Sequence, residues 1–152
     1  MRCEIPGSAA EPTEPAMEPC RILVVDDYVP AAIAVTRLLQ LAGHDVHTVF
    51  TAKDVLDAAR ALRPDVIFLD LSLPGGQDGV EIALRLRAER GLEGTVIVAL
   101  SGRIDAGTDD RFAGARFDYH LLKPVSAGEM ESVMTMVRLR RSAGSTNGRL
   151  AT

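Results

Sequence analysis

Side chains that could carry out chemistry follow four of the apolar segments in this sequence. They are the acidic pair Asp26 and Asp27, then Asp70, Ser101 and Lys123. If the apolar segments are parallel strands, their carboxyl ends meet at one edge of the sheet, where such sheets bind ligands. Carboxylates gathered there repel one another and raise one another's pKa values unless a positive charge lies among them. The set therefore predicts a site for a divalent cation.

The residue types favour magnesium and phosphoryl chemistry. Mg²⁺ prefers oxygen ligands and is typically held by one or two carboxylates together with phosphate oxygens. The Lys123 ammonium and the Ser101 hydroxyl can hold phosphoryl oxygens while charge shifts during transfer. An Asp carboxylate can itself be the nucleophile, and Asp70, at the end of the central predicted strand, is the best placed to form an aspartyl phosphate.

Each of these residues also has an ordinary structural explanation when taken alone. An Asp after a strand more often caps a helix or forms a turn, and Asp26 or Asp27 could cap a helix that begins near Pro30. The Ser-Gly pair at Ser101 could be a simple turn, and most lysines are solvated. Their coordinated placement after four strands favours the functional interpretation.

The elements that would position these side chains alternate regularly along the chain. Short apolar runs predict strands, and apolar residues at helical spacing predict helices. The predicted strands are Ile22–Val25, Val46–Val49, Val66–Leu69, Val96–Leu100 and Phe117–Leu122. The predicted helices run from Pro30 to a stop at Gly43, then Thr51–Leu62, Val80–Arg90, Asp105–Ala113 and Ala127–Arg140. Five such units joined by right-handed crossovers imply a doubly wound α/β fold, a five-stranded parallel sheet with five helices.

Composition predicts one folded domain with a flexible segment at each end. Residues 1–20 form a Pro-rich N-terminal extension, residues 21–140 the domain, and residues 141–152 a flexible tail rich in Ser, Gly and Asn. Cys3 and Cys20 lie in the extension without the spacing of a zinc site and are interpreted as incidental thiols. No signal peptide or membrane-spanning run is evident, so we expect a cytoplasmic location and no membrane contact.

Four motifs occur in order along the chain. They are Val24-Val25-Asp26-Asp27, Ile67-Phe68-Leu69-Asp70 with Leu73-Pro74, Ala99-Leu100-Ser101-Gly102 and Leu122-Lys123-Pro124. Together they resemble the receiver domains of two-component response regulators. The resemblance covers about residues 21–140 and implies a flavodoxin-like fold with strand order 2-1-3-4-5.

The resemblance assigns a role to each residue of the predicted site. It implies that Asp70 is the phosphoacceptor and that Mg²⁺ is bound by Asp27 directly, by Asp26 largely through water, by Asp70 and by the backbone carbonyl of Ser72. It further implies that Lys123 pairs with the free or phosphorylated Asp70 carboxylate and is joined to Pro124 by a cis peptide bond. Ser101 would be the hydroxyl that moves toward the phosphoryl group on activation.

Two features depart from the family pattern. The aromatic residue that reports the switch in many relatives falls at His120, so a switch based on a rotating Tyr or Phe is in doubt. The neighbouring Tyr119 would point to the other face of the strand. The loop containing Gly75 and Gly76 is one residue longer than the usual spacing before the Asp78-Gly79 pair, and its glycines predict a more mobile rim.

The sequence therefore predicts a phosphorelay switch rather than an enzyme. A histidine kinase or histidine phosphotransfer protein would donate the phosphoryl group, and the phosphorylated protein would change its affinity for an unknown downstream protein, with homodimerisation as a further possibility. The net charge of −4 and the lack of an output domain after Arg141 predict a stand-alone receiver without direct DNA binding.

Three alternatives remain open at this stage. A receiver that binds partners without phosphorylation would lack the acceptor, the acidic pair or the lysine, all of which are present. An aspartyl-phosphate phosphatase would have a second Asp where this chain has Ser72. A flavodoxin-like cofactor protein would cradle a phosphate after the first strand, where Asp26 and Asp27 would repel it.

Overall fold

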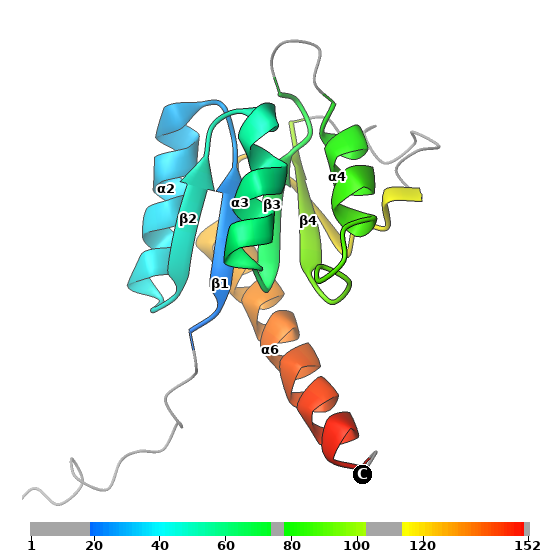
Figure 1. Ribbon diagram of the computed structural model, residues 1–152. Helices are drawn as coiled ribbons and strands as arrows, with labels where there is room; N and C mark the ends of the chain where they lie inside the picture. Colours follow the sequence, from blue (N-terminus) through cyan, green and yellow to red (C-terminus); the bar gives the residue numbers. More distant parts are fainter. Residues whose placement is uncertain (1–18, 74–77, 103–113, 151–152) are drawn as a thin grey trace, which may run out of the picture.

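A single parallel sheet forms the centre of the protein. The computed structural model describes residues 19–73, 78–102 and 114–150. The strand order is β2-β1-β3-β4-β5, and all neighbouring pairs are parallel, which confirms the predicted doubly wound fold. The strands are β1 Arg21–Val25, β2 Asp45–Val49, β3 Val66–Asp70, β4 Val96–Ser101 and β5 Tyr119–Leu122 (Figure 1).

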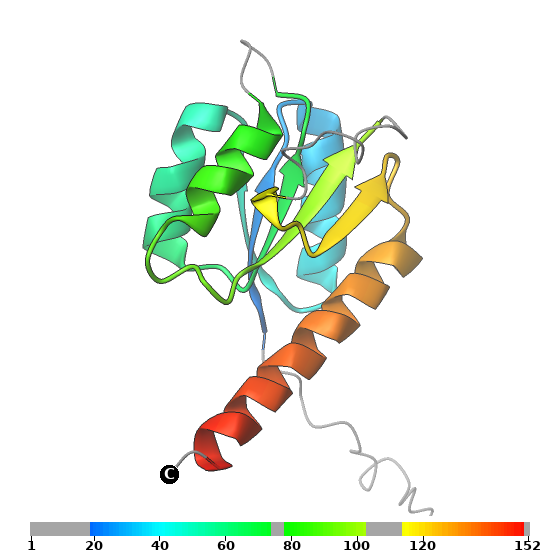
Figure 2. The ribbon, with the colours of Figure 1, turned by 90° about the vertical axis from the view of Figure 1, so that its right-hand side faces the viewer.

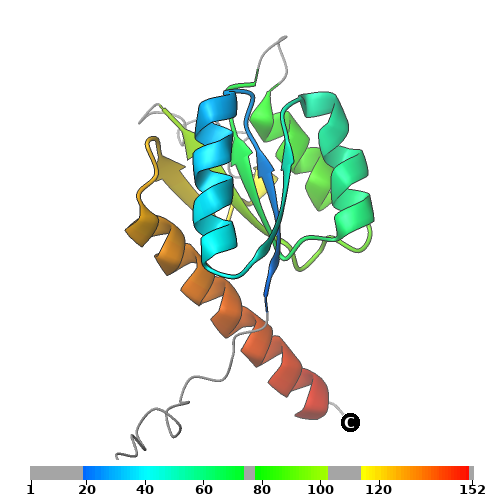
Figure 3. The same ribbon diagram turned by 90° about the vertical axis from the view of Figure 1, so that its left-hand side faces the viewer.

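Helices cover both faces of this sheet. They are α2 Val29–Leu41, the 3₁₀ turn η1 Ala52–Asp54 with α3 Val55–Leu62, α4 Gly79–Arg87 and α6 Ala127–Leu150. Helices α3 and α4 pack on one face, and α2 and α6 on the other (Figures 2 and 3). The fifth predicted helix, Asp105–Ala113, lies outside the described residues. No helix in the described part is long and apolar enough to cross a lipid bilayer.

The three central strands are buried because both sheet faces are covered. Every residue of β3 and β4 is buried, as are residues 22–25 of β1, which explains why these segments are continuous apolar runs rather than alternating ones. Alternate residues of each strand enter two separate cores, one under α3 and α4 and the other under α2 and α6. The same runs end in the polar side chains of the predicted site.

The last helix is longer than the sequence predicted. It continues ten residues past the expected end at Arg140 and reaches Leu150, beyond the amino ends of the strands (Figure 1). Ion pairs fix the turn at which we expected it to end, because Arg140 Nη1 lies 2.9 Å from Asp118 Oδ1 and Arg141 Nη1 lies 3.9 Å from Asp65 Oδ2. Once this turn is fixed, the helix can add further residues without the cost of starting a new helix, so α6 can continue to Leu150.

Cys20 belongs to the core rather than to the extension. It is fully buried, packs in the core under α2 and α6, and its Sγ accepts a hydrogen bond of 3.2 Å from Arg141 Nη1. Burial is the largest cause of a raised pKa for this thiol. The interpretation of Cys20 as an incidental thiol of a flexible segment is therefore wrong.

Asp118 joins three elements just before β5. Its Oδ2 lies 2.8 Å from Arg87 Nη2 and accepts the Ile97 amide at 2.9 Å, and its Oδ1 lies 2.9 Å from Arg140 Nη1. Burial tends to raise the pKa of Asp118, but the Ile97 amide and the two guanidinium groups outweigh it and lower the pKa. These contacts also explain why β5 begins at Tyr119 rather than at Phe117.

We expect Asp118→Asn to lower the free energy of unfolding by about 2 kcal/mol at pH 7. A carboxyl with a lowered pKa in the folded state stabilises above its unfolded pKa of about 3.9, and that stability is lost as the pH falls through the folded value. Denaturant titrations from pH 7 to pH 3 should therefore show the difference from wild type shrinking below about pH 4. A pH-independent difference would contradict the ionic explanation, and Asp57→Asn, at an exposed pair with Arg60, serves as the control.

Candidate functional site

Backbone hydrogen bonds bring the carboxyl ends of the strands to one edge. The Asp26 amide donates to Val49 O at 3.2 Å, the Leu71 amide to Leu100 O at 2.9 Å, and the Lys123 amide to Ser101 O at 2.8 Å. The residues that directly follow or end β1, β3, β4 and β5 therefore lie at fixed positions relative to one another. This is the arrangement that the strand-end rule predicted.

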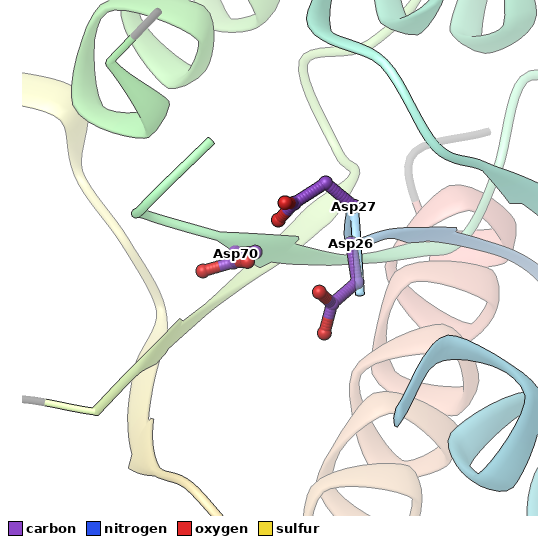
Figure 4. Close-up of side chains that lie close together, drawn as sticks. All are labelled: Asp26, Asp27 and Asp70. Carbon is purple, nitrogen blue, oxygen red and sulfur yellow. The ribbon is translucent and has the colours of Figure 1, made fainter. Parts of the chain in front are cut away.

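Three carboxylates meet at this edge. One oxygen each from Asp26, Asp27 and Asp70 lies within 4.8 Å of the others, and the three side chains gather at the ends of β1 and β3 (Figure 4). Asp26 and Asp70 are buried, each with 2% of its surface exposed, whereas Asp27 is exposed. Two carboxylates of the cluster are therefore buried, and the third, Asp27, is exposed to solvent.

Lys123 connects the two buried carboxylates. Its Nζ lies 3.1 Å from Asp70 Oδ2 and 3.2 Å from Asp26 Oδ2. The Lys123–Pro124 peptide bond is cis, as the resemblance implied. The resemblance predicted an ion pair with Asp70 alone, so the second contact, with Asp26, is an addition that sequence motifs do not reveal.

Backbone amides hold the remaining oxygens of the buried pair. The Tyr28 amide donates to Asp26 Oδ1 at 3.0 Å, and the Ser72 amide donates to Asp70 Oδ1 at 2.9 Å. The Asp26 side chain therefore closes a turn onto Tyr28, the residue before α2, and does not cap the helix, which has no side-chain cap hydrogen bond. Both carboxylates are locked in orientation by one amide and one ammonium.

The electrostatics of the site depend on burial and on Lys123. Burial is the largest effect on Asp70 and raises its pKa, against the lowering influence of the Ser72 amide and the Lys123 ammonium. Burial alone would lower the pKa of Lys123, but the Asp70 and Asp26 carboxylates outweigh it and raise that pKa. Lys123 therefore keeps its proton and supplies a fixed positive charge to the site.

The acidic cluster fits a hard divalent cation. Its donors are all carboxylate oxygens, which suit magnesium rather than a soft metal. One oxygen from each of the three carboxylates lies within 4.8 Å of the others, close enough for a single ion to be held by all three. The three carboxylates outnumber the single ammonium, and a divalent charge would balance the remainder. Asp26, Asp27 and Asp70 are the residues that would hold it.

The other predicted residues lie around this cluster. Ser101 is buried at the end of β4, and Ser72 borders the site through its amide and its antiparallel bridge with Asp78. His120 lies on β5 opposite Ala99 of β4 and is half-buried, while Tyr119 packs against the core under α2 and α6. The loop at Gly75 and Gly76 lies outside the described residues.

Gly79 shapes the site, a role that the sequence motifs did not assign to it. A Cβ atom at Gly79 would lie 2.6 Å from Leu71 Cα and 2.7 Å from Asp70 O, distances that side chains do not adopt. The preceding Asp78 caps α4 by accepting the Val80 amide at 2.8 Å. The Asp-Gly pair was the available signal, since the glycine allows α4 to begin directly against the strand that carries Asp70.

Comparison with known proteins agrees with this geometry. Residues 22–135 match the family described as the response regulator receiver domain. The chain belongs to this family. A solved CheY-like receiver domain from Methylobacillus flagellatus is 28% identical, with a TM-score of 0.70 over 79% of this chain and 99% of that one. The signal receiver domain of a modulated diguanylate cyclase from Desulfovibrio desulfuricans is 30% identical, with a TM-score of 0.72 over 84% of this chain and 99% of that one.

Relatives of this receiver domain correct one expectation about partners. It is 33% identical to the DNA-binding response regulator MtrA of Mycobacterium tuberculosis, over 80% of this chain and 51% of that protein. It is 35% identical to the transcriptional regulatory protein PrrA of Mycobacterium leprae, over 84% of this chain and 53% of that protein. The chain thus spans about half the length of the curated relatives it matches.

The prediction of no direct DNA binding is contradicted by these relatives, since MtrA is named as DNA-binding. The physical error was to infer the absence of DNA binding from net charge. The net charge of a receiver domain describes that domain alone. It carries no information about the rest of a longer protein such as MtrA. DNA binding is not shown for this chain, and the stand-alone architecture and cytoplasmic location stay predictions.

Proposed function

We propose that this receiver domain accepts a phosphoryl group on Asp70 and thereby acts as a switch in phosphorelay signalling. The observation that carries the proposal is that the Asp70 carboxylate lies 3.1 Å from the Lys123 ammonium and forms an acidic cluster with Asp26 and Asp27. A nucleophilic carboxylate, a fixed positive charge and a cation site are the parts that phosphoryl transfer requires.

The reaction would transfer the phosphoryl group from a phosphohistidine of a histidine kinase or phosphotransfer protein. An Asp70 carboxylate oxygen attacks phosphorus, the new O–P bond forms as the donor's N–P bond breaks, and the imidazole leaves with the electron pair of that bond. Lys123 is placed to stabilise charge on the phosphoryl oxygens. Mg²⁺, when bound, would neutralise those oxygens and offset the repulsion between the phosphoryl group and the acidic residues.

The contacts around Asp70 indicate which residues can respond to its phosphorylation. Phosphorylation removes a negative charge from the Asp70 carboxylate and adds a larger one beyond it, so Lys123 must redistribute its contacts between Asp70 and Asp26. Ser101 ends the strand next to β3, and His120 lies one strand further on β5. A movement of Ser101 toward the phosphoryl group would therefore be passed to β5, and we propose Ser101 and His120 as the switch residues.

The protein on this account promotes its own phosphorylation but turns over no substrate, so it is a switch rather than an enzyme. A receiver that works without phosphorylation is the alternative. No described contact favours it, because the acceptor, the acidic pair and the lysine are all brought together.

The test is the intact mass of the protein after incubation with acetyl phosphate, with and without Mg²⁺. The proposal predicts a gain of one phosphoryl group in the wild type, loss of that gain when Mg²⁺ is chelated, and no gain in Asp70→Asn, whose amide is not a nucleophile. Asp65→Asn at the opposite end of β3 is the matched control and should react as the wild type does. A gain that persists in Asp70→Asn would contradict the proposal.

A further inference from the structure

Residues of α2 and α6 line a cleft. Figure 3 shows these two helices on the face of the sheet away from α3 and α4. The volume of the cleft is about 410 Å³, within the range of small-molecule sites. Six lining residues are apolar, namely Leu38, Leu39, Ala42, Ala127, Met130 and Met134, and three are polar, namely His44, Glu131 and Arg138. None of these residues takes part in the phosphorylation site.

His44 lines this cleft and carries an unused hydrogen-bond donor. The imidazole is 8% exposed, and its Nδ1 accepts the Cys20 amide at 3.1 Å. A neutral imidazole that accepts at Nδ1 carries its proton at Nε2. The His44 Nε2 atom is buried and has no hydrogen-bond partner among the described residues. Native proteins rarely leave such a donor unsatisfied without a reason.

The charges around His44 favour an anionic acceptor. Burial, then Arg138 and Arg141, lower the pKa of His44, and the negative charge of Asp65 opposes them more weakly. The ring is therefore a neutral donor with two guanidinium groups near it. Arg138 makes a long 3.4 Å contact with the Thr135 hydroxyl and has no carboxylate partner in the described part of the chain. Glu131, the acidic residue of the lining, lies two helical turns from Arg138, about 10 Å along α6.

We propose that this cleft binds a small amphiphilic carboxylate. The carboxylate head would pair with the Arg138 guanidinium and accept a hydrogen bond from His44 Nε2–H after a small movement uncovers that buried atom, and the apolar body would lie against Leu39, Met130 and Met134. The amide of Cys20 fixes the His44 tautomer that donates. The site is separate from Asp70, because His44 and Cys20 precede β2 and β1 whereas the acidic cluster follows the carboxyl ends of the strands.

The first test is a titration with octanoate, followed by the ¹H–¹⁵N shifts of the full chain. The proposal predicts saturable shifts at residues of α2, α6 and the Cys20 amide, with those around Asp70 unchanged. Octanol and octylammonium have the same chain with a neutral or positive head, and they should bind at least about tenfold more weakly, the value of one charge-assisted hydrogen bond. Equal binding of all three, or no saturable binding of octanoate, would overturn the proposal and leave an apolar groove suited to protein side chains.

Variants assign the head-group contacts. Arg138→Met keeps the apolar stem and should weaken octanoate about tenfold, whereas Arg37→Met on α2, outside the lining, should not. His44→Leu should weaken binding similarly, and His44→Gln, whose amide can accept from Cys20 and donate into the cleft, should restore much of it. Because His44→Leu also removes the acceptor of a buried amide, Ala42→Trp provides a second way to close the cleft. Unchanged octanoate affinity in Arg138→Met and Ala42→Trp would overturn the assignment.

Discussion

Replacing Lys123 with Met is expected to slow phosphoryl transfer to Asp70 by about 100- to 1000-fold. The Lys123 ammonium lies 3.1 Å from Asp70 Oδ2 and 3.2 Å from Asp26 Oδ2, where it can offset charge on the entering phosphoryl oxygens. Without it, two buried carboxylates face each other and the incoming group meets negative charge alone. Lys123→Arg should recover little of the transfer rate, because a planar guanidinium does not replace a compact ammonium in this position.

The rate of acetyl phosphate labelling, followed by intact mass, measures this effect. Lys53→Met, in the 3₁₀ turn η1 away from the acidic cluster, is the matched control and should label at the wild-type rate. Magnesium binding distinguishes lost chemistry from lost folding, because removal of a positive charge should leave Mg²⁺ affinity intact or stronger. A Lys123→Met variant that binds Mg²⁺ and labels as fast as the wild type would refute the role given to Lys123.

Replacing Asp27 with Asn is expected to weaken Mg²⁺ binding at least about tenfold. Asp27 is the exposed member of the acidic cluster, so its carboxylate can be removed without leaving a buried group unpaired. The free energy of unfolding in the absence of metal should therefore change by no more than about 0.5 kcal/mol. The corresponding change at Asp26 would disturb the contacts with Tyr28 and Lys123 and could not separate metal binding from folding.

Isothermal titration calorimetry with Mg²⁺ measures the affinity of the Asp27→Asn protein directly. Asp45→Asn changes an exposed carboxylate at the start of β2, the opposite end of the sheet, and should bind Mg²⁺ as the wild type does. Equal affinities in the two variants would show that Asp27 is not a ligand. The implied magnesium site would then have to be rebuilt around Asp70 and Asp26 alone.

The central strands and the acidic site were predictable because one pattern specified both. Strands β1, β3 and β4 are buried on two faces and therefore appear as continuous apolar runs. The polar residues that end these runs mark the carboxyl ends of the strands, so the sequence alone predicts that Asp26, Asp27 and Asp70 lie together. Parallel strands leave little freedom in where their ends meet.

Features that depend on long-range side-chain contacts were not predictable in the same way. The start of β5 and the extension of α6 depend on Asp118 with Arg87 and Arg140, residues distant in sequence and ordinary in type. The contact between His44 and Cys20 follows from the register that pairs Arg21 with Asp45, because the residues before a paired position are also neighbours. The periodicity within one strand does not by itself say which residue of a neighbouring strand each residue faces.

The most direct test of the central claim is to identify the modified residue chemically. Protein labelled with acetyl phosphate and Mg²⁺ is reduced with borohydride, which converts an aspartyl phosphate to homoserine, and is then mapped by peptide mass spectrometry. The account predicts homoserine at position 70 and at no other aspartate. Homoserine at position 26 or 27, or a stable phosphoryl group on a hydroxyl such as that of Ser101, would contradict the assignment of Asp70 as the phosphoacceptor.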